Sequence, residues 1–176
     1  SGSVAATALT ELSALTTGAV AVSSATNLSG TTAEITAAYA GNTAGTITGL
    51  EDKALTVTDS GSVAATALTG LSALTTGAVA VSFATNLSGT TAEITAAYAG
   101  NTAGAITGLE DKGLTVTDSG SLAATALSEL SALTTGAVAV SSATNLSGTT
   151  AEITAAYAGN TAGTITGLED KALTVT

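Results

Sequence analysis

The sequence contains no cysteine, histidine, methionine, proline, tryptophan or arginine. These absences exclude disulfides, metal sites built from thiolate or imidazole, thiol nucleophiles and imidazole general bases. Aromatic residues make up only 2% of the chain, so the 45% that is hydrophobic is mostly alanine, with valine, leucine and isoleucine. Because large apolar and aromatic side chains line most ligand pockets, their scarcity argues against an enzyme.

Positive charge is scarce as well. Three lysines stand against thirteen acidic residues, which gives a formal net charge of −10. This charge would repel nucleic acid, and the chain has no basic stripe with interleaved aromatics. Thr, Ser or Gly interrupts every Ala- and Val-rich stretch, so we expect no membrane insertion either. The sequence has no signal peptide and no starting methionine, from which we expect a segment of a longer chain.

What the sequence has in abundance is internal repetition. Ser-Gly-Ser recurs at residues 1, 60 and 119, so the chain divides into three copies, 1–59, 60–118 and 119–176, with a period of 59 residues. Copies one and two differ at four positions, and copies one and three at two. A weaker repeat inside each copy, 26–45 over 58–77, predicts two coils of about 27 and 32 residues.

Short extended segments are expected where residues alternate or are β-branched and follow a glycine or a turn. These segments are 19–23, 46–48 and 55–58. A longer block has apolar residues at the helical spacing i, i+4, i+8 and i+11, namely Val63, Ala67, Leu71 and Leu74. We expect a helix there, with Ser62 as its N-cap and Gly77 as its stop.

The other long block begins with a capping box. Thr31 and Glu34 have the spacing at which each side chain bonds the backbone N–H of the other residue. The helix is expected to end at Gly41. Its inward-facing side chains are expected to be Ile35, Ala38 and Tyr39.

These features together predict a repeat solenoid. Each coil would hold a strand, a loop and a short helix, with about two coils per 59-residue unit and the strands stacked in parallel along one side. Small Ala, Gly and Thr side chains suit the narrow interior of such a coil. Because Thr and Ser weaken helices, an all-β solenoid is the alternative.

Two segments of the repeat, LSGTTAEITAAYAG (28–41) and ITGLEDKALTVTDSGS (47–62), resemble repeats of giant bacterial cell-surface proteins of the marine cyanobacterial type. The resemblance covers all three copies. It implies an extracellular protein that serves as a stalk, adhesin or surface coat. It supplies no catalytic residue.

Acidic residues recur in the Leu-Glu-Asp-Lys turn of each copy and shortly after it. Calcium binds clustered carboxylate oxygens, so stacked turns could form a calcium site from Asp52, Asp59, Asp111, Asp118 and Asp170. The spacing is not that of a dedicated calcium loop, and a lysine follows each acidic pair. The alternative is solvated turn residues, with Asp59 and Asp118 capping the segment that follows. No other cofactor is expected.

Thr-x-Thr triplets occur at 46–48 and 56–58, and flat ice-binding solenoids use this pattern. Ala105 replaces threonine in the second copy, which interrupts one of the threonine rows. Strand propensity explains these threonines without ice. The recurring tyrosines, Tyr39, Tyr98 and Tyr157, are expected to be core fillers rather than a ladder of stacked rings.

We therefore expect a structural, non-enzymatic tandem-repeat segment of an extracellular bacterial surface protein, acting as an elongated stalk, coat or self-assembling fibre. Its expected partners are neighbouring repeats or copies of itself end to end, because open strand edges pair readily. Surface polysaccharide is a further candidate partner. The alternatives are a calcium-dependent adhesive or carbohydrate-binding module, and an ice-binding solenoid.

Overall fold

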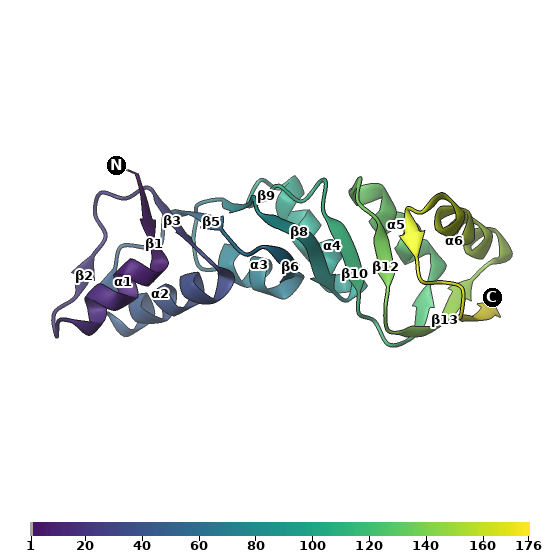
Figure 1. Cartoon of the computed structure of the whole chain (residues 1–176), viewed down its shortest axis with the longest axis horizontal. Helices are drawn as coiled ribbons and strands as arrows, with labels where there is room; N and C mark the ends of the chain where they lie inside the picture. The colour runs from purple at the N-terminus through teal and green to yellow at the C-terminus, as the bar shows by residue number, and fades with distance from the viewer. Residues whose placement is uncertain (1) are drawn as a thin grey trace. The chain divides into compact units, whose positions relative to one another are not determined.

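The computed structural model describes residues 2–176, and in this range it contains six helices and fifteen strands. Helices alternate with strands along the chain, and the strands form several parallel sheets, which makes this an α/β fold (Figure 1). The predicted solenoid of stacked coils is therefore wrong. The all-β alternative is wrong too, because each copy contributes two helices.

The chain forms two compact units. The first holds the chain up to Gly61 together with Ala67–Ala84 and Ala99–Gly108, and the second holds Ser62–Thr66, Thr85–Tyr98 and Leu109–Thr176. Their borders fall within strands β6 (Gly61–Ala64) and β8 (Ala84–Gly89), within helices α3 (Ala65–Ser72) and α4 (Thr91–Thr102), and between Gly108 and Leu109. Both units are built on parallel sheets.

The first unit contains a five-stranded sheet in the order β1-β3-β5-β7-β9. Its strands are β1 (Ser3–Ala5), β3 (Asn27–Gly30), β5 (Ala54–Val57), β7 (Val79–Val81) and β9 (Ile106–Thr107). A two-stranded sheet pairs β2 (Val20–Ala21) with β4 (Ile47–Thr48). Helices α1 (Ala6–Ala14) and α2 (Thr32–Ala44) pack against each other.

The second unit contains a five-stranded sheet in the order β14-β12-β10-β8-β6 and a three-stranded sheet, β11-β13-β15. The strands of the larger sheet are β6 (Gly61–Ala64), β8 (Ala84–Gly89), β10 (Gly113–Val116), β12 (Val138–Val140) and β14 (Ile165–Thr166). Those of the smaller sheet are β11 (Gly120–Ala123), β13 (Ala143–Gly148) and β15 (Ala172–Val175). Helices α5 (Ala124–Leu133) and α6 (Thr150–Ala162) pack together.

Each five-stranded sheet combines three strands of one copy with two strands of the next. Strands β1, β3 and β5 come from residues 1–59, and β7 and β9 from residues 60–118. The second sheet follows the same rule one copy later. The predicted solenoid put every strand in one continuous stack. The structure instead divides the strands of a copy between separate sheets.

The three segments predicted to be extended all contain strands, β2, β4 and β5. The strand β3 was not predicted, because Asn, Ser and Gly favour turns. Its Leu28 is buried while Asn27 and Ser29 beside it are half-buried, which is the alternation of a strand. Leu28 and Leu55 face the same aliphatic core.

The predicted start of the helix after residue 61 is wrong. Ser62 and Val63 lie in strand β6, and helix α3 begins at Ala65. In the first copy α1 begins after Ala5, with no side-chain cap. Apolar spacing alone did not separate the end of the strand from the start of the helix. No helix within residues 2–176 combines the length and apolar character needed to cross a bilayer.

The capping box of α2 is confirmed. The N–H of Glu34 donates to Thr31 Oγ1 at 3.3 Å, and the N–H of Thr31 donates to Glu34 Oε2 at 2.8 Å. The three side chains predicted to face inward, Ile35, Ala38 and Tyr39, are buried. The helix continues past Gly41 to Ala44 and ends at Gly45, whose φ of 76° is a left-handed conformation that suits glycine.

Candidate functional site

The structure does not bring the candidate calcium residues into a cluster. Asp52, Asp111 and Asp170 each accept a bond from the lysine that follows, at 2.6, 2.7 and 2.7 Å, and these carboxylates are exposed. The hydrogen bond from the lysine ammonium lowers the pKa of each of these carboxyls. Within the described residues, no three His, Cys, Asp or Glu side chains are grouped to hold a metal. Calcium binding stays a prediction.

Asp59 and Asp118 bond to the starts of helices that precede them in the chain. Asp59 Oδ2 accepts from the N–H of Thr32 at 2.6 Å, and Asp118 Oδ2 accepts from the N–H of Thr91 at 2.6 Å. The expected capping therefore occurs on a helix 27 residues earlier, not on the following segment. Strand pairing explains this, because Val57 lies opposite Gly30 and carries Asp59 to the start of α2.

The tyrosines are core residues that hold the acidic turn. Tyr39 Oη donates to the carbonyl of Leu50 at 2.7 Å, and Tyr98 Oη donates to that of Leu109 at 2.7 Å. Both rings are buried, which confirms the core-filler expectation. Burial raises the pKa of both tyrosines above its usual value. In the third copy, Tyr157 is only half-buried, although it donates to Leu168 at 2.8 Å.

The turns after Tyr39 and Tyr98 are each covered by the copy that follows. We call the contact of residues 51–57 with 75–81 the first junction. In it the N–H of Thr76 donates to the carbonyl of Glu51 at 2.8 Å, and Thr75 Oγ1 donates to that of Lys53 at 2.6 Å. The N–H of Leu55 donates to the carbonyl of Ala78 at 2.8 Å.

The contact of residues 110–116 with 134–140, the second junction, repeats this arrangement. The N–H of Thr135 donates to the carbonyl of Glu110 at 2.8 Å, and Thr134 Oγ1 donates to that of Lys112 at 2.6 Å. Leu114 N donates to Ala137 at 2.8 Å. The two junctions thus share the same donors, acceptors and distances.

A glycine is required where the backbones meet in each junction. A Cβ on Gly77 would overlap the carbonyl of Lys53 and lie 2.6 Å from the nitrogen of Ala54. Gly136 meets Lys112 and Gly113 in the same way. The equivalent Gly18 of the first copy has only Thr16 Oγ1, at 3.5 Å, near its Cβ position.

Outside the two complete junctions, two further segments each have the sequence of one half of a junction. Residues 169–175, the tail half-junction, repeat 51–57 without change, and residues 12–22, the head half-junction, include the sequence TTGAVAV of 75–81. Leu173 is 51% exposed and Val175 64%, whereas Leu55 and Val57 are fully buried. In the head half-junction Leu12 is 51% exposed, against 2% for its equivalent Leu71.

Sequence reasoning expected open strand edges at the ends but did not identify these residues. The signal that could have found them is that residues 16–22, 75–81 and 134–140 have the same sequence, TTGAVAV. The threonines and glycine of this segment were interpreted only as residues of turns and helix ends. The role of Thr75 depends on its hydrogen bond to the carbonyl of Lys53, which lies more than twenty residues earlier in the chain.

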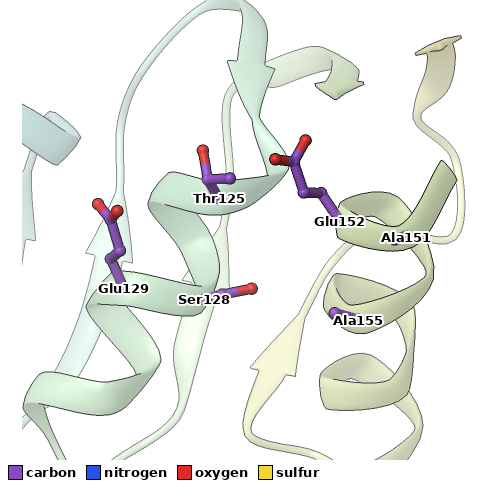
Figure 2. A pocket seen from close by; sticks show the side chains of 6 residues that line it. All are labelled: Thr125, Ser128, Glu129, Ala151, Glu152 and Ala155. Atoms are coloured by element: carbon purple, nitrogen blue, oxygen red, sulfur yellow. The ribbon is translucent and has the colours of Figure 1, made fainter. Parts of the chain in front are cut away.

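A groove of about 390 Å³ lies between α5 and α6 (Figure 2). It is lined by Thr125, Ser128 and Glu129 of α5 and by Ala151, Glu152 and Ala155 of α6. Glu152 Oε2 accepts from the N–H of Thr149 at 2.7 Å and therefore belongs to the cap of α6. The sequence analysis did not find this groove.

The threonines in the middle of the strands take part in a polar row across each sheet. Thr56 Oγ1 lies 3.2 Å from Asn27 Oδ1, and Asn27 Nδ2 donates to Ser3 Oγ at 2.8 Å. The second and third copies repeat the row through Asn86 and Asn145. These threonines therefore bond to their neighbours in the sheet, and ice binding stays a prediction.

Comparison with protein-family models, with curated proteins and with solved structures finds no match. The resemblance to repeats of cyanobacterial surface proteins therefore stays a prediction. The repeated contacts of the junctions are the observation from which a function can be inferred.

Proposed function

We propose that this chain is a structural, non-enzymatic repeat segment of an extracellular bacterial surface protein, and that its junctions carry load from one copy to the next. The observation behind the proposal is that the two junctions repeat the same three hydrogen bonds to backbone carbonyls, two from backbone N–H groups and one from a threonine hydroxyl, at 2.6–2.8 Å. Such repetition is what a spacer or scaffold of adjustable length requires.

Burial at the junctions supports the proposal. Leu55 and Val57 are fully buried, and strand β7 of the next copy lies beside them in register, with Leu55 opposite Val79 and Val57 opposite Val81. Neighbouring copies in a repeat protein stabilise one another through such interfaces. A pull on one copy is therefore transmitted to the packed side chains and backbone bonds of the next.

The distribution of charge is consistent with a role outside the cell in a crowded layer. The net charge of −10 opposes lateral clumping of neighbouring chains. Each lysine pairs with the exposed aspartate that directly precedes it in the chain. Little positive charge is therefore left to attract a neighbouring chain.

Force measurement on single molecules of the 176-residue chain tests the load-bearing role. We expect the chain, pulled from its two ends, to resist extension, and Leu114→Asp in the second junction to lower the unfolding force. Leu173→Asp, the same change outside a complete junction, is the control and should leave that force unchanged. Extension of the unaltered chain without measurable resistance would contradict the proposal.

Surface labelling tests the location. An antibody against residues 28–41 should bind intact cells of the source bacterium without permeabilisation. Labelling that requires permeabilised cells would contradict the extracellular part of the proposal and leave the load-bearing part in place.

A further inference from the structure

We propose that the groove between α5 and α6 binds a linear alkyl diammonium ion, the chemistry of a polyamine. The inference goes beyond the structural role proposed above and does not depend on it. Alanine methyl groups form part of the lining, and each helix contributes one carboxylate. The volume of about 390 Å³ lies within the roughly 300–1,000 Å³ of ordinary small-molecule sites. Such a lining is complementary to a ligand with an alkyl chain between two positive charges.

The small side chains of the groove leave room for an alkyl chain. Ala155 of α6 and Ser128 of α5 point toward each other across it, and Ala151 lies about one helical turn before Ala155 (Figure 2). Both alanines are exposed, so methylene groups that cover them remove apolar surface from water. Ser128 stands where the first copy has Thr10, and it lacks the extra methyl group of threonine.

Glu152 is held in place before a ligand arrives. It stands in the first turn of α6, and its side chain points toward α5 (Figure 2). The N–H of Thr149 donates to Glu152 Oε2 at 2.7 Å, which fixes the side chain, while Oε1 takes no part in this bond. A fixed side chain loses little conformational freedom when it binds a ligand. One ammonium group therefore lies at Glu152 Oε1, and the second lies at the exposed carboxylate of Glu129.

The two carboxylates have no lysine partner within the described residues. Each of the three lysines is bonded to the aspartate that directly precedes it, at 2.6 or 2.7 Å. Within residues 2–176, neither Glu129 nor Glu152 takes part in an ion pair. With its net charge of −10 the chain attracts cations from solution, and at this groove a cation also gains contacts for its alkyl chain.

The size and the charges of the groove favour a small diammonium ion over other occupants. Stable protein interfaces bury about 1,200–2,000 Å² in total, far more than a groove lined by six side chains can offer. An ion with one ammonium group would pair with one carboxylate and leave the other to water. A metal ion gains nothing from alanine methyl groups, and within residues 2–176 no three His, Cys, Asp or Glu side chains are grouped to hold one.

Neighbouring copies leave this face of the helices uncovered. The middle copy has a copy on each side, and its equivalents of the two alanines, Ala92 and Ala96, are exposed as well. A copy that follows the third one therefore would not close the groove. The middle copy has Gly70 in place of Glu129 and so lacks one of the two carboxylates. We expect the copies to differ in their affinity for the ion for this reason.

NMR titration of the 176-residue chain with diaminobutane tests the proposal, with backbone amide shifts as the readout. Saturating shifts should be largest in α5 and at the start of α6. Butylamine has the same alkyl chain and one charge, and we expect it to bind several-fold more weakly. Glu129→Gln and Glu152→Gln should each weaken binding by about two- to fivefold, the effect of losing one exposed ion pair. In Glu152→Gln the new side chain still accepts from the N–H of Thr149, so the cap of α6 is retained.

Asp52→Asn, the same loss of charge in the other compact unit, is the control and should leave binding unchanged. Far-UV circular dichroism should be the same for all three variants. Shifts spread evenly over the acidic residues of all three copies, or an equal loss of affinity in the control, would overturn the inference, because the ion would then only screen the net charge. Butylamine that binds as tightly as diaminobutane, or shifts that never saturate, would overturn it as well.

Discussion

Strands β5 and β15 have the same four residues, Ala-Leu-Thr-Val, and pair in the same register with the strand before them, yet their environments differ. Leu55 of β5 is fully buried and Leu173 of β15 is 51% exposed. The difference lies at the second edge of the strand, the one that does not pair with the strand before it. At this edge β5 pairs with β7 of the next copy. Local sequence decides that the segment is a strand, and the neighbouring copy decides whether its side chains are buried.

The largest expected effect is on leucine truncation at these two strands. Leu55→Ala should lower the free energy of unfolding by about 2–5 kcal/mol, because it leaves a cavity in a packed core. Leu173→Ala should change it by less than about 0.5 kcal/mol, as surface substitutions usually do. Urea unfolding followed by circular dichroism, at a concentration where the chain is monomeric, measures both. Equal losses would show that the next copy does not decide burial.

A second prediction concerns the glycines of the junctions. Gly77→Ala should destabilise the chain by about 1–3 kcal/mol, because the added methyl group meets backbone atoms that cannot move freely. Gly18→Ala should cost less than about 0.5 kcal/mol in the monomer. Thermal unfolding of the two variants side by side checks this. A clearly destabilised Gly18→Ala variant would mean that the backbone around Gly18 is already tightly packed in this chain.

The starts of helices α2 and α6 can be compared in the same way. Asp59→Ala should cost about 0.5–2 kcal/mol, the usual range for a lost N-terminal cap, because the N–H of Thr32 loses a partner at 2.6 Å. Thr150, the equivalent of Thr32 in α6, has no corresponding aspartate within residues 2–176. Amide hydrogen exchange should therefore be faster at the start of α6 than at the start of α2. Similar protection at both starts would argue against the capping role of Asp59.

The tyrosines predict how stability depends on pH. Burial raises the pKa of Tyr39 and Tyr98 above the usual 10.0, so the folded chain holds these protons more tightly than the unfolded chain does. Their contribution is complete below pH 10 and is lost as pH rises through the folded-state pKa. Unfolding free energies measured from neutral to alkaline pH should fall above pH 10, and Tyr39→Phe should reduce that fall. An unchanged fall in the variant would assign it to other groups.

The smallest effect is expected at the exposed ion pairs. Asp52→Asn removes a bond of 2.6 Å to Lys53, but the aspartate is 74% exposed, and surface ion pairs contribute little. The free energy of unfolding should be almost unchanged. A clear loss in urea unfolding would mean that the mostly buried lysine depends on this carboxylate.

Local features were the part of the fold that the sequence could predict. The capping box of Thr31 and Glu34 and the strand at 55–58 depend on neighbouring residues, and both are present. Strand β3 was missed because its Asn, Ser and Gly are bonded and packed across the sheet, where turn preferences no longer decide. Which strands share a sheet could not be predicted, because that choice is made between copies.

The candidate site shows the same division. Asp59 was expected to cap the segment that follows it, but it accepts from the start of α2, because strand pairing and not chain order selects its partner. Gly77 was expected to stop a helix, but α3 already ends at Ser72. The role that the structure gives Gly77, close contact with the turn of the previous copy, becomes visible only when Lys53 is brought beside it.

Because every five-stranded sheet takes three strands from one copy and two from the next, the sheets tolerate a change in copy number. A protein with one copy more or one copy fewer is 59 residues longer or shorter, and each boundary between copies joins the same three strands to the same two. A longer or shorter protein made in this way contains no new packing interface. The number of copies can therefore change without a compensating substitution elsewhere in the chain.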